Sequence, residues 1–442
     1  MPIRLQYNAI KLIILCIMIS KGWQMIRDIL LLQKRELERR RSEKFVERNT
    51  DYKTPLANDL VKVITGPRRA GKSFLGFNML EGSGERFGYA NFDDEKLVDT
   101  KNYDDIINAL SSLYGNPRYL LFDEIQNLSK WELFVNRLQR QGYNLVITGS
   151  NSNLLSSELA THLTGRHMLI NIFPFSFAEF LKADSGDKEL TSSETKAKLS
   201  DYLACGGYPE PLIKELDRRD YLSTLFNSII YKDIISRFRI RIVPAIENLA
   251  VYLVSNTGRE FSYNALSKIT GCRSVHTVEK YLQYLEESFL FFKLHRFSPG
   301  VQEQVSSNKK IYCVDNGFIK AKAFRTGDDT GMLYENAVAV KLKKDEMDGG
   351  ARVYYWKHPL QQEVDFVLKE GAEIRQLIQV CWNLADIQAK EKEEKSLMKA
   401  ANELDCGNLL VINDDYEGEK ELRWFGVTRT VKYIPLWKWL LA

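Results

Sequence analysis

The sequence predicts an α/β fold in which a parallel sheet carries helices on both faces, followed by a helical domain and a second, smaller α/β domain. Three observations predict it. Short apolar runs alternate with helical patterns between residues 61 and 173, a glycine-rich loop follows the first run, and the composition changes near residues 197 and 309. Strands that alternate with helices are typical of a parallel sheet.

The bulk composition fits a protein of several domains. The chain has 442 residues, of which 44% are hydrophobic and 27% charged, so more than one hydrophobic core is expected. Its 62 basic and 58 acidic residues give a net charge of +4, which does not favour a protein built chiefly to coat nucleic acid. The six cysteines form no C-x-x-C pair, and the five histidines show no metal-binding spacing. We therefore expect a reducing, cytoplasmic location.

The N-terminus combines a short apolar run with an amphipathic helix. LIILCIMI, residues 12–19, is too short to cross a membrane as a helix, which takes about 20 apolar residues. It also lacks the small-residue cleavage site expected after a signal peptide. The pattern MIRDILLLQKRELERRR predicts an amphipathic helix from Met25. We therefore predict no stable membrane span, and we expect residues 1–24 to be a start-site extension or an accessory segment.

Five apolar runs predict the strands of the first domain, residues 25–196. They are VKVIT (61–65), FGYANF (87–92), RYLLFD (118–123), NLVITG (144–149) and HMLINIF (167–173). The near-continuous apolar character of RYLLFD and NLVITG is typical of strands buried on both sides. Helical patterns such as SFLGFNML and SKWELFVNRLQRQ lie between the strands, and a polar segment around 184–196 ends the domain.

The loop after the first strand reads GPRRAGKS and matches the pattern G-x-x-x-x-G-K-[ST]. Glycines let backbone N–H groups turn toward phosphate oxygens, and the helix that follows presents the positive end of its dipole. We expect Lys72 to reach the β- and γ-phosphates and Ser73 to bind Mg²⁺. A basic turn without a ligand is the alternative. The predicted phosphate-binding residues are Gly66, Pro67, Arg68, Arg69, Ala70, Gly71, Lys72, Ser73 and Phe74.

Two adjacent acids end the third predicted strand. We expect Asp123 to hold Mg²⁺, directly or through water, and Glu124 to activate the attacking water as a base. Paired acids at a strand end are often a solvated turn, but these follow a buried run, which favours a position across the phosphates from Ser73. The guanine-binding pattern N-K-x-D is absent, so the sequence predicts ATP as the nucleotide.

Polar residues at other strand ends are candidates for sensing the nucleotide. Asn151 follows the fourth strand and can contact the γ-phosphate, although Ser150 and Asn151 are equally typical of a helix cap. Asn91 ends the second strand and can restrain Glu124. Arg166 precedes the last strand and can reach the γ-phosphate of a neighbouring subunit, a surface ion pair being the alternative.

GPRRAGKS, FDEIQ, ITGSN and LTGR, in that order and spacing, resemble the AAA-type ATPases of archaea and bacteria that carry an uncharacterised C-terminal domain. The similarity extends over most of the chain from about Met25, through ACGGYPE, YKDIISR and IYCVDNGF. The resemblance implies a sheet order of 5-1-4-3-2. It also implies that Asn151 is a sensor, that Arg166 is a finger acting on a neighbouring copy, and that Arg237 lies near the nucleotide.

Residues 197–305 predict a helical domain with the layout of a winged helix, in which three short helices precede a strand. Binding to phosphates requires an excess of Lys and Arg on the contacting face. The third helix instead mixes charges, since it carries His276, Lys280 and Gln283 beside Glu279, Glu286 and Glu287. DNA binding is therefore possible but not favoured, and docking of an unknown protein partner is the alternative.

Residues 306–442 are similar to a restriction-nuclease-like fold, which binds a metal through a helix glutamate, a strand aspartate and a following E-x-K strand. Glu335 and Asp365 match the first two positions, but Gln379 and Cys381 stand where E-x-K is expected. Glutamine is a weaker ligand for Mg²⁺ than glutamate, and cysteine does not supply the charge of lysine. Lys357, on a neighbouring strand, is a possible substitute. The pattern favours an inactive nuclease-like module.

Three functions compete on this sequence. The first is hydrolysis of ATP with Mg²⁺ as a conformational switch, with the C-terminal domains as regulatory or partner-docking modules and a possible homo-oligomer. The second is an ATP-controlled DNA-binding regulator, and the third an ATP-dependent nuclease. The loop and acid motifs favour the first, the mixed charge of the third helix counts against the second, and Gln379 and Cys381 count against the third.

Overall fold

The protein is described by a computed structural model that covers residues 22–50, 56, 58–150, 165–272, 274–324 and 329–442. The chain folds into two compact units. Among the described residues, the N-terminal unit runs from residue 22 to Phe45, from Thr50 to Gly66 and from Gly71 to Ile172. The C-terminal unit comprises Val46–Asn49, Pro67–Ala70 and the described residues from Phe173 onward.

The N-terminal unit is built on a five-stranded sheet of order β2-β3-β4-β1-β5, all parallel. Read from the other edge this order is 5-1-4-3-2, so the predicted topology is confirmed. The strands coincide closely with the five predicted runs: β1 Val61–Thr65, β2 Phe87–Asn91, β3 Tyr119–Asp123, β4 Asn144–Gly149 and β5 His167–Asn171. β1 is buried along its whole length, as expected for the central part of a covered sheet.

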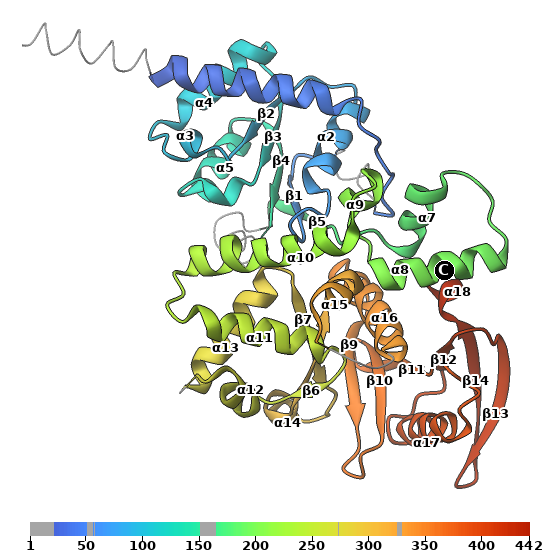
Figure 1. The fold of residues 1–442 in the computed structure, drawn as a ribbon. Helices are drawn as coiled ribbons and strands as arrows, with labels where there is room; N and C mark the ends of the chain where they lie inside the picture. Colours follow the sequence, from blue (N-terminus) through green and yellow to red (C-terminus); the bar gives the residue numbers. More distant parts are fainter. Residues whose placement is uncertain (1–21, 51–55, 57, 151–164, 273, 325–328) are drawn as a thin grey trace, which may run out of the picture. The chain divides into compact units, whose positions relative to one another are not determined.

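Helices flank this sheet (Figure 1). They are α2 Lys72–Gly82, α3 Glu95–Val98, α4 Tyr103–Tyr114 and α5 Trp131–Arg140, with a short 3₁₀ turn, η2 Ile125–Asn127. A further helix spans residues 22–40, which confirms the amphipathic helix predicted from Met25. Ile26, Ile29 and Leu30 of that helix belong to the same hydrophobic core as Val61 and Phe122 of the sheet. The apolar run 12–19 lies outside the described residues.

The C-terminal unit begins with a series of helices. They are α7 Phe177–Ser185, α8 Ser192–Cys205, α9 Pro209–Ile213, α10 Arg218–Ser228, α11 Val243–Ser255, α12 Tyr263–Thr270 and α13 Val275–Glu287, with a π-helix, η3 Ile229–Ser236, directly after α10. Two begin with a capping box, Ser176 with Glu179 at α7 and Thr191 with Glu194 at α8. These local signals explain why α7 and α8 start where they do.

The rest of the C-terminal unit is organised by a nine-stranded mixed sheet of order β13-β14-β12-β11-β10-β9-β7-β8-β6. Its strands are β6 Glu260–Phe261, β7 Phe291–Arg296, β8 Lys309–Cys313, β9 Arg352–Lys357, β10 Glu363–Glu370, β11 Glu373–Val380, β12 Leu409–Asn413, β13 Gly418–Trp424 and β14 Val427–Pro435. Its helices are α14 Val301–Ser306, α15 Asn316–Lys322, α16 Thr330–Met347, α17 Ile387–Glu403 and α18 Leu436–Leu441. The sheet therefore includes strands on both sides of residue 305, where the composition predicts a domain boundary.

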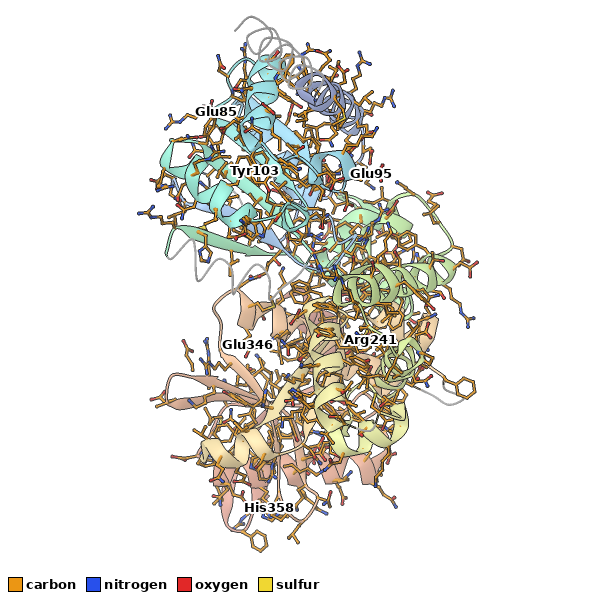
Figure 2. The ribbon with its side chains drawn as sticks, turned by 90° about the vertical axis from the view of Figure 1, so that its left-hand side faces the viewer. Glu85, Glu95, Tyr103, Arg241, Glu346 and His358 are labelled. Carbon is orange, nitrogen blue, oxygen red and sulfur yellow. The ribbon has the colours of Figure 1, made fainter. Side chains whose placement is uncertain are left out.

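Figure 2 shows the side chains of the described residues, with His358 in the loop that joins β9 to β10. Among these residues, no helix combines the length and the apolar character that crossing a membrane requires.

Candidate nucleotide-binding site

The loop that joins β1 to α2 depends on its two glycines. Gly66 has φ 150°, and a Cβ atom there would lie 1.9 Å from the carbonyl oxygen of Ile172, far inside contact distance. Gly71 has φ 97°, a left-handed conformation that side chains disfavour. Both backbone positions are therefore open only to glycine, which explains why the loop carries these residues at its start and end.

The first turn of α2 suits an anion. The helix runs from Lys72 to Gly82, its N-cap is Gly71 with no side-chain cap, and no acidic residue lies in its first turn. The positive end of the helix dipole attracts negative charge at such a terminus. The loop and helix together therefore offer the backbone donors and the cation that a phosphate group needs.

Lys72 is buried beside this loop, with 4% of its surface exposed. Its ammonium donates a hydrogen bond to the carbonyl oxygen of Gly66 at 3.1 Å. The same Nζ lies 3.9 Å from Oε1 of Glu124. The lysine is thus held across the loop, with its charge facing the carboxyl end of the sheet.

Asp123 ends β3 and accepts hydrogen bonds from three hydroxyl groups. Ser73 Oγ lies 2.8 Å from Oδ1, Thr148 donates to the same oxygen, and Tyr89 lies 3.3 Å from Oδ2. Burial raises the pKa of Asp123, and the charge of Glu124 raises it further, whereas the Thr148 and Ser73 hydrogen bonds lower it. The adjacent carboxylate and hydroxyl oxygens form a donor set that Mg²⁺ prefers.

Glu124 has an unusual backbone conformation directly after the strand. Its φ of 50° is left-handed, which for a non-glycine residue is sparsely populated and common at functional sites. Its Oε2 accepts hydrogen bonds from Gln126 Nε2 at 2.5 Å and from Ser150 Oγ at 3.1 Å. The side chain of Asn91 instead accepts from the backbone N–H of Asp93 at 2.9 Å. Gln126 and Ser150 thus provide the restraint that the sequence assigned to Asn91.

The tip of the loop, Pro67–Ala70, groups with the C-terminal unit and makes its contacts there. Arg68 forms an ion pair with Asp233 of η3 at 2.9 Å, and Arg69 forms one with Glu210 of α9 at 3.3 Å. Both arginines therefore have carboxylate partners from the YKDIISR and ACGGYPE segments of the sequence.

A residue that the sequence did not single out, Arg48, supports the same tip. Its guanidinium donates to the carbonyl oxygens of Ala70, at 3.0 Å, and of Phe173, and pairs with Glu179 at 3.1 Å. Both side chains are almost fully buried, at 5% and 1% exposed. The planar guanidinium also lies over the ring of Phe175 at 4.9 Å. Arg48 therefore holds the backbone of the phosphate loop at Ala70.

Of the other three predicted site residues, the structure describes Arg166 and Arg237. Asn151 lies outside the described residues. Arg166 is exposed just before β5, and its carbonyl oxygen accepts a hydrogen bond from the N–H of Val61 at 3.0 Å. Arg237 follows η3 and is half-buried in the C-terminal unit. Lys72, Ser73, Asp123 and Glu124, in contrast, lie together at the carboxyl edge of the five-stranded sheet.

Sequence reasoning missed Thr148, Tyr89 and Gln126. Thr148 and Tyr89 lie inside strands β4 and β2, where hydroxyl-bearing residues are ordinary, so no local signal marks them. β3 pairs in parallel with both β2 and β4, which brings the carboxyl ends of these strands to the same sheet edge as Asp123. This pairing, once known, would have pointed to the hydroxyl groups on β2 and β4.

Comparison with known proteins divides the chain into three matched domains. An AAA domain matches residues 58–181, a domain of unknown function (DUF8612) matches 196–329, and another (DUF4143) matches 330–439. Among solved structures, the Thermotoga maritima RuvB Holliday junction branch migration motor is 18% identical with a TM-score of 0.29, over 53% of this chain and 81% of that chain. A structure titled for katanin self-assembly is 17% identical with a TM-score of 0.26, over 50% and 71%.

Two relatives extend over nearly the whole chain. An uncharacterized protein of Methanocaldococcus jannaschii is 32% identical over 411 residues, which cover 89% of this chain and 91% of that protein. An uncharacterized protein of Haemophilus influenzae is 31% identical over 376 residues, covering 81% and 88%. The chain, with its AAA domain followed by two domains of unknown function, therefore belongs to the same family as these two proteins.

Proposed function

We propose that the protein binds ATP with Mg²⁺ at the loop of residues 66–73 and hydrolyses it as a conformational switch. The observation that carries this proposal is the contact between the loop and the acidic strand end. Ser73 Oγ lies 2.8 Å from Oδ1 of Asp123, and Lys72 Nζ lies 3.9 Å from Glu124. A loop amide cradle, an ammonium, a metal-ligand pair and a candidate base thus meet at one sheet edge.

Each of these groups has a distinct role in the proposed reaction. The N–H groups of the loop and the first turn of α2 bind phosphate oxygens, and Lys72 offsets the charge of the β- and γ-phosphates. Glu124 accepts a proton from the attacking water, while Gln126 and Ser150 hold its carboxylate in place. Mg²⁺, held by Ser73 and Asp123, would neutralise charge on the phosphates.

Two further residues complete the proposed site, one of them from a second copy of the chain. Arg166 is exposed at the start of β5, which suits an arginine that reaches the γ-phosphate of a second copy. We propose a homo-oligomer on this basis, with Asn151 as the sensor of the γ-phosphate. An arginine supplied by a neighbour stabilises charge that develops during phosphoryl transfer.

The C-terminal modules are proposed to respond to the nucleotide and to dock a protein partner. The order α11, β6, α12, α13 and the hairpin β7–β8 supports a winged helix. On α13 the exposed residues Glu279 and Lys280 are neighbours in sequence, and His276 lies 3.7 Å from Glu279, so acidic and basic side chains are mixed on this helix. Mixed charge of this kind supports a protein surface rather than a phosphate backbone as the partner.

Phosphate release from purified protein with Mg²⁺ and ATP tests the proposal. We expect Lys72→Ala to weaken ATP binding and abolish release, and Glu124→Gln to abolish release while ATP binding persists. Glu85→Gln is the matched control, because Glu85 is an exposed acid of the same unit and should leave the rate unchanged (Figure 2). The assignment would be overturned if the wild-type protein releases phosphate and both site variants release it at the same rate.

A mixing experiment tests the role of Arg166. Arg166→Ala and Lys72→Ala variants, each inactive alone, should regain part of the activity when combined, because a mixed assembly contains one intact site between unlike copies. Mass measurement with and without ATP should show assembly when nucleotide is present. Two inactive variants that stay inactive together in a demonstrated oligomer would exclude action between copies.

A further inference from the structure

One buried lysine of the C-terminal unit lies among carboxylates from two different elements. Lys310 is on β8, and only 3% of its side chain is exposed. Its ammonium lies 2.9 Å from Glu335 of α16, 2.6 Å from Glu363 of β10 and 3.2 Å from Asp365 of β10. A helix and a strand that are distant from β8 in sequence supply these acids, so the fold itself gathers them around one nitrogen atom.

The carboxylates are oriented by further contacts. Tyr312 donates to the same oxygen of Glu335 that meets the ammonium, at 2.6 Å. Oδ2 of Asp365 accepts from Gln379 Nε2 at 2.9 Å and from the N–H of Val380 at 3.0 Å, which leaves Oδ1 for Lys310. Hydrogen bonds within the protein therefore already orient the oxygens of Glu335 and Asp365 that face the ammonium.

The geometry is that of a cation bound by several acids. Three carboxyl groups, those of Glu335, Glu363 and Asp365, face the one ammonium of Lys310 at 2.6–3.2 Å. With 3% of its side chain exposed, this ammonium is bound by protein oxygens in place of water.

We propose that the ammonium of Lys310 is a built-in substitute for a divalent metal ion. Glu335, Glu363 and Asp365 form a cation site that the chain fills with its own side chain. Mg²⁺ and Ca²⁺ take carboxylate oxygens at about 2.0–2.6 Å, so the ligands need to move by only about 1 Å to hold a metal in place of the nitrogen. Removing the ammonium should then turn the cluster into a site for a hard divalent cation.

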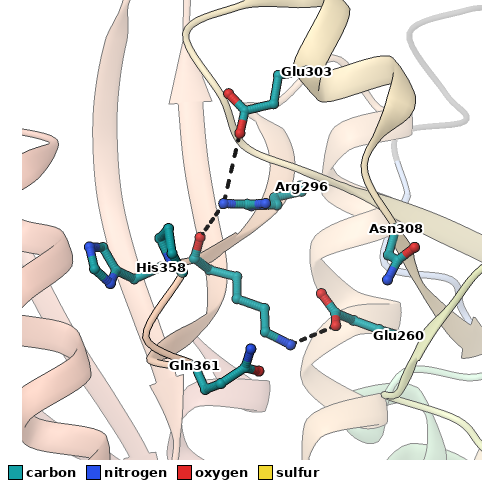
Figure 3. Close-up of a pocket in the computed structure, with 8 residues that line it drawn as sticks. Glu260, Arg296, Glu303, Asn308, His358 and Gln361 are labelled. Atoms are coloured by element: carbon teal, nitrogen blue, oxygen red, sulfur yellow. Dashed lines mark hydrogen bonds and ion pairs between the residues drawn. The ribbon is translucent and has the colours of Figure 1, made fainter.

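Lys357 provides the matched comparison. It lies on β9 beside the same cluster, 3.6 Å from Glu363, but its closer partner is Glu260 at 2.6 Å. Lys357 and Glu260 line a cavity of about 390 Å³. Figure 3 shows Glu260 in this cavity with Arg296 and Glu303. With 20% of its side chain exposed, Lys357 is reached by water, whereas Lys310 is not. Of these two lysines, Lys310 alone lies at the point where all three carboxylates meet.

Binding of Mn²⁺ alone, counted by electron paramagnetic resonance without nucleotide, tests the proposal on the full chain. We expect Lys310→Ala to bind one more Mn²⁺ per chain than the wild-type protein does, and Asp365→Asn in the same background to lose that ion. Lys357→Ala should gain none. Added Mn²⁺ should also raise the melting temperature of Lys310→Ala and not that of Lys357→Ala.

Two results would overturn the proposal. One is a wild-type protein that already binds a Mn²⁺ which Asp365→Asn removes, because the ammonium would then not occupy the metal position. This measurement needs no lysine variant to fold. The other is a folded Lys310→Ala, or the more conservative Lys310→Asn with an oxygen ligand of its own, that gains no ion. The omission of ATP keeps both outcomes independent of the proposed hydrolysis.

Discussion

Asp123 of the N-terminal unit and Asp365 of the C-terminal unit are both buried carboxylates whose pKa values burial raises. Their hydrogen-bond donors differ. Asp123 accepts from the hydroxyl groups of Ser73, Thr148 and Tyr89, which carry no charge. Asp365 accepts from the ammonium of Lys310 at 3.2 Å and from neutral amides.

This difference shows that burial of an acid does not by itself mark a metal site. Hydroxyl donors orient a carboxylate but leave its charge to be balanced by a cation that arrives with a ligand. An ammonium balances the charge within the fold, which turns similar side chains into a structural element. The charge of the donors therefore distinguishes a candidate catalytic carboxylate from a stabilising one.

Substituting the two lysines should separate these roles most clearly. Lys310→Met leaves three carboxylates without their cation, so we expect the free energy of unfolding to fall by about 3–5 kcal/mol. Lys72→Met should cost less stability but lower ATP hydrolysis by at least about 100-fold, because a donor to the phosphates is lost. Urea unfolding and phosphate release measure the two effects. Equal losses of stability would contradict the comparison.

The buried cation Arg48 allows the loss of stability at a buried ion pair to be compared with the loss at an exposed one. Arg48→Met leaves Glu179 buried and unpaired, and we expect a loss of about 3–5 kcal/mol in the free energy of unfolding. Arg41→Met is the control, since the Arg41–Glu81 pair is 59% and 41% exposed and should contribute at most about 1 kcal/mol. The double variant Arg48→Met, Glu179→Gln should regain part of the loss. Similar effects at the exposed and buried pairs would show that burial is not the cause.

Asp315 is a buried acid whose hydrogen-bond donors are backbone N–H groups, and it should make the stability of the protein depend on pH. Burial raises the pKa of Asp315 from 3.8 to about 7, although N–H groups of Gly207 and Gly317 bind its oxygens. The folded state then holds a proton that the unfolded state releases, so the free energy of unfolding falls as pH rises from about 4 to 7. The slope is about 1.4 kcal/mol per pH unit at most.

Asp315→Asn should remove this contribution, so its stability should depend less on pH than that of the wild-type protein. Urea unfolding at pH 5 and pH 8 measures the difference. A variant with an unchanged slope would show that Asp315 is ionised throughout this range in the folded protein.

Single hydroxyl groups should give the smallest effects. Thr148→Val removes a donor to Asp123, so the pKa of this carboxyl should rise and the acidic limb of hydrolysis should move to higher pH, with a loss of about threefold near neutrality. Tyr312→Phe removes the donor to Glu335 and should cost about 1–2 kcal/mol of stability without changing hydrolysis. Rates against pH and unfolding curves test the pair. An unchanged pH profile for Thr148→Val would contradict the role given to hydroxyl donors.

The N-terminal sheet and its loop could be predicted because local patterns carry them. β1 and β4 are mainly apolar runs at the predicted residues, and Gly66 and Gly71 mark the loop between β1 and α2. The contact of Ser73 with Asp123 follows once β1 and β3 are both neighbours of β4. Local signals and topology agree here, so the sequence suffices.

In the C-terminal unit the resemblance paired Glu335 with Asp365, but the position of Lys310 between them could not be predicted, because it depends on which strands pair. Lys310 lies near the start of a strand, KKIYC, where a lysine would ordinarily face solvent. Its burial follows only from the position of β8 between β6 and β7, and from α16 packing against it. The hairpin β13–β14 was also missed, although the alternating pattern of Val427–Pro435 and the turn at Gly426 offered a signal.

Arg48 also affects how the protein can be divided for experiments. The AAA match begins at residue 58, beyond the guanidinium that holds Ala70 and neutralises Glu179. A recombinant fragment cut at the limits of that match would keep the carboxylate at the start of α7 and lose its counter-ion. Expression boundaries for biochemical work should therefore include residues 46–49, even though they precede the matched AAA domain.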